Sequence, residues 1–313
     1  MAFANPTDAF TKVDLDAFIP EVWSPIIRDL KYASMSIMNF ATNLSYLLDD
    51  GGDIIHVPNI YTNAFTVQTQ TVEGNGVVDQ SPAAADSTLT VDTHKYIAFV
   101  IGDKTMKQMI QNEEVSRRYA EQARNLLVKT VEDSIFALYT SLTPTAVGST
   151  TLAVTDLDIR AAIATMTSTD GTVFEMEDLA FFFDNTVYWN QVLGIAKYYD
   201  KSKSDMNPIR TGKLNYGADA SRGTLFGELY GIPVYVTPRV VKATSVAKNM
   251  LVHRDAFAFA THTQGKNGIR VQSQYLLTNL ATLTVVDIIY GVGILRTNAG
   301  VVINALQTQT TNG

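Results

Sequence analysis

Apolar side chains change their spacing within one predicted strand, residues 89–103 (LTVDTHKYIAFVIGD). From Leu89 to His94 apolar and polar residues alternate, which is typical of a strand with one face in water. From Tyr96 to Ile101 every residue is apolar, which is typical of a strand buried on both faces. We therefore expect residues 96–101 to form the base of a β-hairpin inside the protein, and residues 89–94 to lead away from it.

The other arm of this hairpin is predicted at residues 53–72 (DIIHVPNIYTNAFTVQTQTV), which alternate and are rich in β-branched side chains. Residues 73–88 carry the Gly, Asn, Asp and Pro residues that are typical of turns. The part away from the base has few large apolar side chains, and an isolated two-stranded ribbon is only marginally stable in water. The hairpin therefore either projects onto another surface or folds back on its own domain, and the pattern favours neither.

Two segments have the pattern of helices. Residues 26–48 place apolar side chains along one stripe. Residues 103–143 contain no Gly or Pro and consist largely of residues that favour helix. We expect this second segment to be a long helix with a break at Asn112, since Asn caps helices well. Its apolar stripe consists of Ala123, Leu127, Val131, Ile135, Leu138 and Leu142.

Patterns of short helices and short strands alternate from residue 144 to about 265, which predicts a compact α/β unit. In order, we expect a helix in DLDIRAAIATM, a buried strand in LAFFFD, a helix in NTVYWNQVLGIAKYY capped by Asp184, a strand in GIPVYVTPRV, and a strand turning into a short helix in NMLVHRDAFAFAT. Residues 266–306 predict two or three long strands that pack on the long helix, with a bend or bulge at Gly291 and Gly293. The polar tail 307–313 is expected to fray.

Composition and charge exclude several classes of protein. The 313 residues carry a formal net charge of −7, and no run of Lys or Arg reaches three, so the electrostatic surface that grips nucleic acid is missing. The absence of cysteine excludes disulfides and thiolate metal sites. There is neither a basic and apolar leader nor an apolar run of about 18 residues. We therefore expect a soluble protein that is made in the cytosol.

No motif with catalytic or metal-binding chemistry stands out. The four histidines lack metal-ligand spacing, and there is no nucleophile elbow or phosphate-binding loop. The acidic residues Glu175, Glu177 and Asp178 are better explained as a solvated segment before a strand than as paired carboxylates for acid–base work. We therefore expect no enzyme activity, no cofactor and no metal. An α/β enzyme with an unrecognised site is the alternative from a different class.

The charge of the hairpin predicts a contact with another subunit. Between Gly52 and Lys95 there is no Lys or Arg, and three acidic residues are predicted at the tip. An acidic tip favours a positively charged landing surface, for which the long helix of a neighbouring copy is the candidate. The acidic residues are Glu73, Asp79 and Asp86, and the basic ones are Arg117, Arg118 and Arg124.

The first 27 residues predict an extended arm. Pro6, Pro20 and Pro25 disfavour a helix, and the scattered aromatic side chains suit an extended segment that lies against an apolar surface. Trp23 is the candidate subunit contact within this arm.

The order of these elements closely resembles the major capsid proteins of tailed bacteriophages, which have the Hong Kong 97-type shell fold. The segments that carry the resemblance are LTVDTHKYIAFVIGD, EEVSRRYAEQARNLLVKTVEDSIFALYTSL, RGTLFGELYGIPVYVTPRV, NMLVHRDAFAFA and YGVGILRTNAGVVI. The resemblance implies an α+β chain with an N-terminal arm (1–27), a helix and link (28–53), an extended loop (54–101), a peripheral-domain spine helix (102–149), an axial domain (150–265), peripheral C-terminal strands (266–306) and a tail (307–313).

The resemblance also implies a function. Copies of the chain would assemble as hexamers and pentamers into an icosahedral shell around double-stranded DNA, with only weak, non-specific contact to that DNA. Portal and scaffolding or decoration proteins would be further partners, no membrane would be involved, and the protein would lie in the virion capsid after assembly in the host bacterial cytoplasm. An encapsulin-like bacterial compartment shell is the alternative with the same fold.

Overall fold

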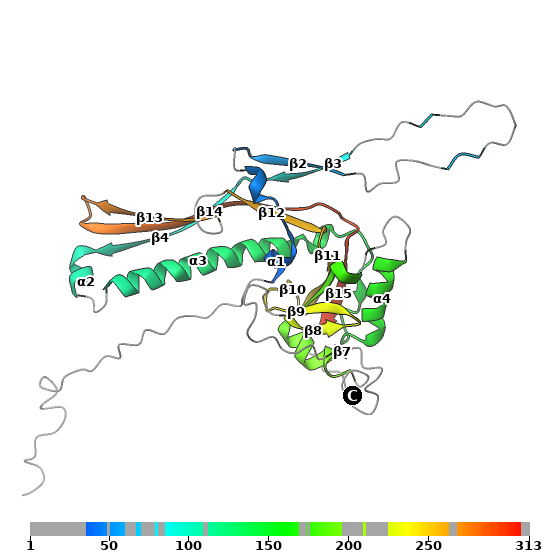
Figure 1. Ribbon diagram of the computed structural model, residues 1–313. Coiled ribbons are helices and arrows are strands. Elements are labelled where there is room, and N and C mark those ends of the chain that lie inside the picture. The colour runs from blue at the N-terminus through cyan, green and yellow to red at the C-terminus, as the bar shows by residue number, and fades with distance from the viewer. Residues whose placement is uncertain are drawn as a thin grey trace, which may run out of the picture.

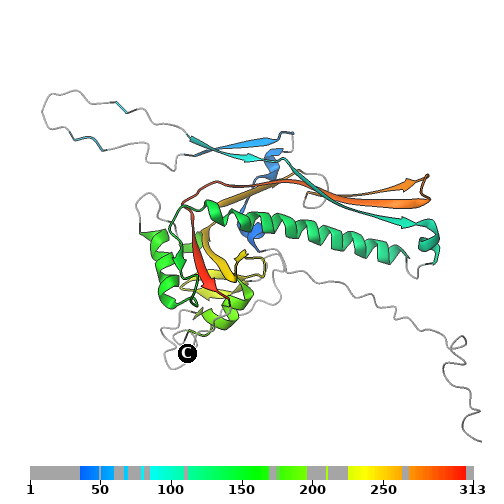
Figure 2. The same ribbon diagram turned by 180° about the vertical axis from the view of Figure 1, so that it is seen from behind.

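The computed structural model describes residues 36–48, 51–59, 67–69, 79–80, 85–108, 112–168, 174, 176–195, 209–210, 225–262 and 268–307. These residues form a five-stranded sheet beside a long helix, an eight-stranded sheet and a two-stranded hairpin. The long helix α3 and the five-stranded sheet extend away from the compact unit that holds the eight-stranded sheet, and the hairpin β2–β3 lies on the other side of the sheet from α3 (Figure 1). The view from behind shows the same arrangement (Figure 2).

The five-stranded sheet is built around its longest strand. It consists of β1 (Thr42–Asn43), β4 (Thr93–Gly102), β12 (Phe257–Thr261), β13 (Ile269–Leu276) and β14 (Ala281–Ile294). Strands β4 and β13 pair antiparallel with the first part of β14, and β12 pairs antiparallel with its last part. Among the described residues β4 pairs only with β14, so β4 is an edge strand.

The eight-stranded sheet forms the compact part of the molecule. Its path is β5 (Val147–Gly148), β15 (Gly300–Leu306), β11 (Val246–His253), β6 (Leu179–Phe183), β9 (Ile232–Val236), β8 (Leu225–Leu229) and β7 (Ile209–Arg210), with β10 (Lys242–Ala243) paired to β11. Around it lie α4 (Asp156–Thr167), η5 (Met176–Asp178), α5 (Asn185–Val187) and the π-helix η6 (Tyr188–Val192). The predicted N-cap of the α5 helix is confirmed, because the Asp184 side chain accepts a hydrogen bond from the Thr186 backbone N–H.

The predicted long helix is confirmed in two parts. These are α2 (Asp103–Gln108) and α3 (Asn112–Ala137), and the 3₁₀ turn η4 (Leu138–Ser141) follows. The stripe residues Ala123 to Ile135 are buried, and the Ser134 hydroxyl lies 3.1 Å from the Tyr290 hydroxyl of β14. The C-terminal strands therefore pack on the helix as predicted.

The predicted continuous helix over residues 26–48 is wrong for the part that the structure describes. Residues 36–48 contain the short helix α1 (Ile37–Phe40), strand β1 and the 3₁₀ turn η3 (Ser45–Leu48). Strand β1 pairs in parallel with β12, and the Asn43 side chain accepts hydrogen bonds from the backbone and hydroxyl of Ser45. These polar side chains and the neighbouring strand replace the hydrogen bonds of a helix.

The hairpin is formed by β2 (Ile54–Asn59) and β3 (Ala85–Thr90), which pair antiparallel. The predicted single strand 89–103 is instead two strands, because the chain leaves β3 after Thr90 and begins β4 at Thr93, where it joins a different sheet. The change of apolar pattern therefore falls where the chain passes from the hairpin to the five-stranded sheet. The prediction that Tyr96 to Ile101 is buried on both faces is wrong, since Tyr96 is 67% and Val100 53% exposed.

One main hydrophobic core joins the two large sheets. Phe182 of β6 contacts the rings of Phe40, Phe136 and Tyr235, with centroid distances of 5.7, 5.9 and 5.1 Å. Residue 265 does not separate the strands of one sheet from those of the other along the chain. Strand β12, before it, belongs to the five-stranded sheet, and β15, after it, belongs to the eight-stranded one. The predicted short helix after β11 is also wrong, since residues 257–261 form β12 with all five residues buried.

Candidate subunit-interface surfaces

The hairpin is held at its root by a second hydrophobic cluster. Ile55 of β2 and Leu89 and Val91 at the end of β3 are buried against Leu44, Leu48, Ala258 and Ala260. The Val91 backbone N–H donates to the carbonyl oxygen of Asp53 at 2.7 Å, which closes the hairpin at this end. The cluster fixes the root on β12 and β14, while the opposite end of the paired strands, Asn59 and Ala85, points away from both large sheets (Figure 1).

Two of the three acidic residues predicted at the tip lie within the described residues. Asp79 is exposed. Asp86 lies in β3, not at the tip, and its carboxylate is 2.6 Å from Nδ1 of His56 on the facing strand. Asp86 therefore already has a partner in its own chain. Glu73 and Trp23 lie outside the described residues.

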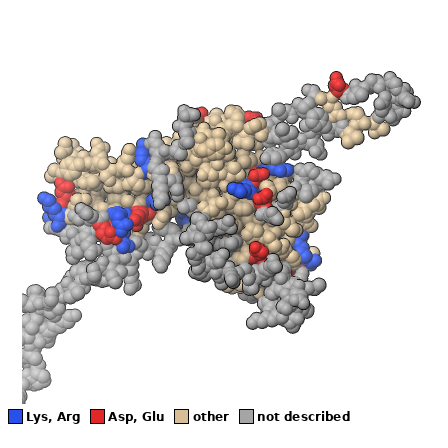
Figure 3. Space-filling model, in the orientation of Figure 1, with Lys and Arg blue, Asp and Glu red and all other residues tan. Residues whose placement is uncertain are grey.

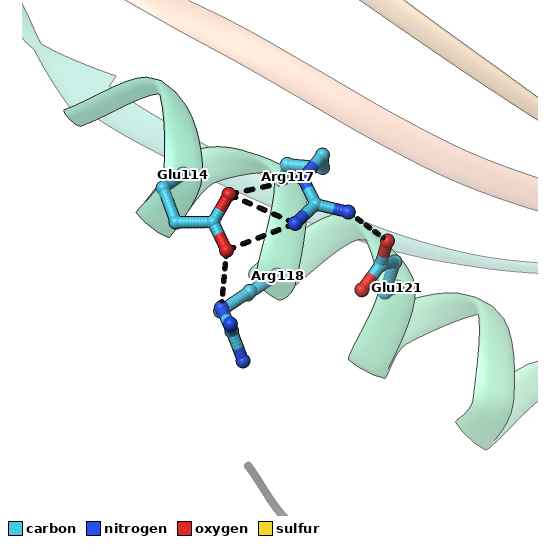
Figure 4. Close-up of polar contacts among 4 residues, drawn as sticks. All are labelled: Glu114, Arg117, Arg118 and Glu121. Carbon is cyan, nitrogen blue, oxygen red and sulfur yellow. Dashed lines mark hydrogen bonds and ion pairs between the residues drawn. The ribbon is translucent and has the colours of Figure 1, made fainter. Parts of the chain in front are cut away.

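Arg117 and Arg118, two of the three basic residues predicted as a landing surface, are paired with glutamates of their own helix α3 (Figure 4). Arg117 lies 2.8 Å from both Glu114 and Glu121, and Arg118 lies 2.6 Å from Glu114. The hydrogen bonds from Arg117 and Arg118 lower the pKa of Glu114, and Glu114 raises the pKa of Arg117. The charges of these two arginines and two glutamates cancel, so the four side chains together carry no net charge.

Arg124 differs from the other two arginines. It is half-buried on α3, and among the described residues it makes no ion pair. Of the three arginines it is thus the one for which the described part of the chain shows no ionic partner.

The outer face of the five-stranded sheet, opposite α3, is open over its distal half. Tyr96, Ala98 and Val100 of β4 are exposed there, next to the half-buried Leu283 and Val285 of β14. The alternation of a strand places these side chains on the face that α3 does not cover. Figure 3 shows the sheet as a mostly uncharged surface, with charged side chains gathered along the helix below it. Exposed apolar surface of this kind marks protein contacts.

A charged triad crosses the same outer face between its open and covered halves. Asp287 of β14 is buried, and its carboxylate lies 3.0 Å from Nε2 of His94 on β4 and 2.7 Å from the Arg270 guanidinium on β13. The hydrogen bond from Arg270 lowers the pKa of Asp287 despite its burial. The triad ties three neighbouring strands together.

The turn between β13 and β14 exposes two leucines at the far end of the sheet. Leu277 is 79% and Leu280 64% exposed, and Leu280 has a φ of 44°, which a side chain with a Cβ rarely adopts. The Tyr275 hydroxyl donates to Asp103 of α2 at 2.6 Å, and this hydrogen bond raises the pKa of Tyr275. Sequence reasoning missed this surface, although the run LLTNL between two strands is a signal for it.

A buried ion pair joins α3 to the eight-stranded sheet. Glu132 of α3 is fully buried, accepts a hydrogen bond from the Ser36 backbone N–H at 2.6 Å, and lies 2.7 Å from Nε of Arg239. Arg239 follows β9, and its guanidinium is also 4.0 Å from Asp133. Burial raises the pKa of Glu132, and Ser36 and Arg239 offset only part of that rise. The resulting pKa is about 7.

The described residues hold no group of three or more potential metal ligands. Among the helices of the described chain, none is long and apolar enough to cross a membrane.

No protein-family model matches the sequence, and no curated protein does. Solved structures are similar over almost the whole chain. A structure of Mycobacterium phage Che8 superposes with a TM-score of 0.69 at 17% identity, over 91% of this chain and 97% of that one. The capsid of Ralstonia phage GP4 gives a TM-score of 0.64 at 12% identity, over 100% and 99%. The holo-SrpI encapsulin complex of Synechococcus elongatus PCC 7942 gives 0.63 at 11%, over 97% and 99%.

The superpositions extend over nearly the full length of both chains, so the similarity is one of the overall fold and not of a single part. The resemblance found in the sequence is therefore confirmed for the fold. The chain has the α+β Hong Kong 97-type shell fold of phage capsid proteins.

Proposed function

We propose that the chain is a major capsid protein of a tailed bacteriophage, whose copies assemble as hexamers and pentamers into an icosahedral shell around double-stranded DNA. The observation that carries the proposal is the hairpin β2–β3, which is fixed at its root and directed away from both sheets. A ribbon without a core of its own gains stability only on another surface, and a neighbouring copy supplies one.

The open half of the five-stranded sheet supports the same proposal. Tyr96, Val100, Leu277 and Leu280 expose apolar side chains along one end of the molecule. In a closed shell every copy has neighbours on all sides, so many such contacts act together and each one need contribute little. The proposal assigns no catalytic activity to the chain.

The division of the chain follows from this proposal. We assign residues 1–27 to an N-terminal arm, 28–53 to a helix and link, 54–101 to the extended loop, 102–149 and 266–306 to a peripheral domain, 150–265 to an axial domain and 307–313 to a tail. In this division the axial range contributes β12 to the five-stranded sheet and the peripheral range contributes β15 to the eight-stranded one, so the two domains would exchange strands around one core.

The hairpin tip and the arm are the proposed contacts to neighbouring copies. Asp79 and Glu73 would approach basic residues of a neighbour, and Arg124 is a better candidate than Arg117 or Arg118, whose charges Glu114 and Glu121 already offset. Asp86 contributes less, because it is paired with His56. Trp23 would anchor the arm on an apolar surface.

Further partners belong to the same proposal. Portal and scaffolding or decoration proteins would bind the shell, which would form in the host bacterial cytoplasm and become the virion capsid. The net charge of −7 favours only weak, non-specific contact with packaged DNA.

An encapsulin-like compartment shell is the second candidate. The specific observation in its favour is the similarity to the holo-SrpI encapsulin complex over 97% of this chain. Such a shell would enclose protein cargo in place of a genome.

Negative-stain electron microscopy of the expressed full chain, alone and in lysate of infected cells, tests the proposal when the nucleic acid content of the particles is assayed. Icosahedral particles with double-stranded DNA are the expected result. Particles that hold protein cargo and no genome would support the compartment. Only small oligomers under every condition would contradict both.

A further inference from the structure

The hairpin crosses β14 at two glycines. Gly291 and Gly293 lie two residues apart and therefore on the same face of β14, and this face carries the root of the hairpin. The pairing of β14 with β12 continues through both positions, Ala260 with Gly291 and Ala258 with Gly293. The two glycines therefore form no bulge in this pairing and are sites of close approach between strands.

Gly291 permits a contact between two backbones. A Cβ atom at this position would lie 2.2 Å from the carbonyl oxygen of Thr90 and 2.9 Å from Cα of Val91. Such distances are far below van der Waals contact, and neither atom belongs to a side chain that is free to rotate away. Any residue other than glycine at 291 must therefore move the root of the hairpin away from the sheet.

Gly293 is less demanding. A Cβ atom there would lie 2.9 Å from Cδ1 of Leu89, while its distance to the nearest backbone atom, the carbonyl oxygen of Thr88, would be 3.9 Å. A change in the Leu89 side chain is sufficient to relieve that contact. The two glycines therefore differ in a way that substitutions distinguish.

Other contacts hold the root in the same place. Leu89 and Val91 are almost fully buried in the second hydrophobic cluster, and the Ser87 hydroxyl donates to the carbonyl oxygen of Leu295 at 3.0 Å. The root is therefore held along five residues, from Ser87 to Val91, and it cannot pivot without losing these contacts.

We propose that Gly291 is the positioning residue of the hairpin: the backbone contact that it permits with Thr90 sets the direction in which the hairpin leaves the sheet. A lift of about 1 Å at Thr90, over a root about 13 Å long, tilts a hairpin of about 20 Å enough to move its far end by about 1.5 Å. The importance of this direction for assembly rests on the proposed function, because a displaced hairpin misses its contact on a neighbouring copy.

The test measures the direction of the hairpin in the unassembled full chain. Because the sequence has no cysteine, spin labels can be attached at Asp86→Cys on the hairpin and Asn125→Cys on α3, both exposed positions. Electron–electron double resonance then gives the distance distribution between them. Gly102→Ala is the matched control, since a Cβ atom at Gly102 meets nothing within 4 Å.

We expect Gly291→Ala to shift the mean distance by about 1.5 Å or to broaden the distribution, and Gly102→Ala to leave it unchanged. Gly293→Ala should give a smaller shift, which Leu89→Val reverses because valine has no Cδ1 atom. If Gly291→Ala does not fold, the Gly293→Ala and Gly293→Ala/Leu89→Val pair decides the question by the same measurement.

Distributions that coincide for wild type, Gly291→Ala and Gly102→Ala would overturn the proposal, whether or not the wild type forms shells. If Gly291→Ala does not fold, a distance shift in Gly293→Ala that Leu89→Val does not reverse would also overturn the proposal. A wild-type chain that forms no shell contradicts the proposed function and leaves the distance result standing. Where shells form, Gly291→Ala should yield few or misshapen particles, and Gly102→Ala normal ones.

Discussion

The two large sheets bury their strands to different extents. In the eight-stranded sheet, β6 is buried at all five positions, and Phe182 packs between the rings of Phe136 and Tyr235. In the five-stranded sheet, five consecutive residues of β13 are exposed, as are Tyr96 and Val100 of β4. Both sheets have strands that are rich in apolar residues, but only the first finds cover for both faces within the chain.

This difference indicates which part of the molecule is complete on its own. The eight-stranded sheet has its helices and the shared core around it, whereas the five-stranded sheet has α3 on one face and the hairpin root on only part of the other. Under the proposed function, neighbouring copies cover the remainder. Substitutions in the first sheet should therefore affect folding, and substitutions in the second should affect assembly.

The largest effect is expected for Phe182→Ala. Removal of a fully buried phenylalanine side chain that contacts three rings should lower the free energy of unfolding by about 3–5 kcal/mol. Chemical denaturation of the unassembled chain measures this value. The matched change on the open sheet, Tyr96→Ala, should alter it by no more than about 0.5 kcal/mol and reduce the yield of particles. Similar destabilisation by both would remove the distinction between the sheets.

Glu132 should make stability depend on pH at the junction of the sheets. Its pKa is about 7 in the folded chain against an ordinary value of 4.5, so the folded state binds the extra proton. The contribution of Glu132 is therefore greatest below pH 4.5 and is lost as pH rises through 7. Between pH 5 and 8, wild type should lose up to about 3 kcal/mol relative to Glu132→Gln.

Denaturation midpoints of both proteins across that range measure the loss. Asp133→Asn is the graded comparison, because Asp133 is 46% exposed and its charge helps to raise the pKa of Glu132. The stability of this variant should fall as that of wild type does, with the fall ending at lower pH. A wild-type profile parallel to that of Glu132→Gln would show that Glu132 does not titrate in this range.

Leu280→Gly should separate stability from assembly at the far end of the open sheet. Leu280 has a φ of 44°, which costs about 1–2 kcal/mol for a residue with a Cβ atom, while glycine adds about 0.5–1 kcal/mol of chain entropy on unfolding. The free energy of unfolding should stay equal or rise by about 0.5 kcal/mol. The loss of an exposed leucine should lower the yield of particles in electron microscopy.

Leu280→Ala is the comparison for this variant, because alanine keeps the backbone strain and also removes the side chain. It should lower the particle yield as much as Leu280→Gly does, without any gain in stability. Normal particles from both variants would exclude the turn from the subunit contacts.

The smallest effect is expected for charge at the hairpin tip. Asp79→Lys should leave the unassembled chain as stable as wild type, since the side chain is exposed, and should reduce assembly most strongly at low salt. Mixing with Arg124→Glu chains should restore assembly if the two residues meet between copies. Asp53→Lys, an equal change at the exposed root of the hairpin, is the control. Normal assembly of Asp79→Lys would remove the proposed tip contact.

The sequence allowed much of the architecture to be predicted where local pattern and packing agree. The uninterrupted run 103–143, the apolar strand LAFFF and the Asp184 cap all form the predicted elements. In each case the residues that favour the element are also those that bury or cap it. The order of these elements was sufficient to identify the fold, although no family model matches the sequence.

The failures occur where distant strands decide the local structure. Thr42 and Asn43 leave the predicted helix because β12 offers them a parallel strand, and residues 89–103 divide because β14 captures the second half. The arginine residues of α3 show a different limit of the sequence reading, because the prediction left out their pairing within the helix. The spacing of Glu114, Arg117 and Glu121 on one helix face already indicated pairing within the helix, and the prediction did not use it.

Strand β15 is translated after every other strand that the structure describes, yet it lies between β5 and β11 and pairs with β11 over seven residues. While the ribosome is still making the chain, the edge of β11 is therefore unpaired and the eight-stranded sheet is unfinished. A subunit released before residue 306 would carry this exposed edge, which favours aggregation with other strands. The topology thus makes synthesis of residues 300–306 a condition for a complete eight-stranded sheet, and under the proposed function chains truncated before them would be kept out of the shell.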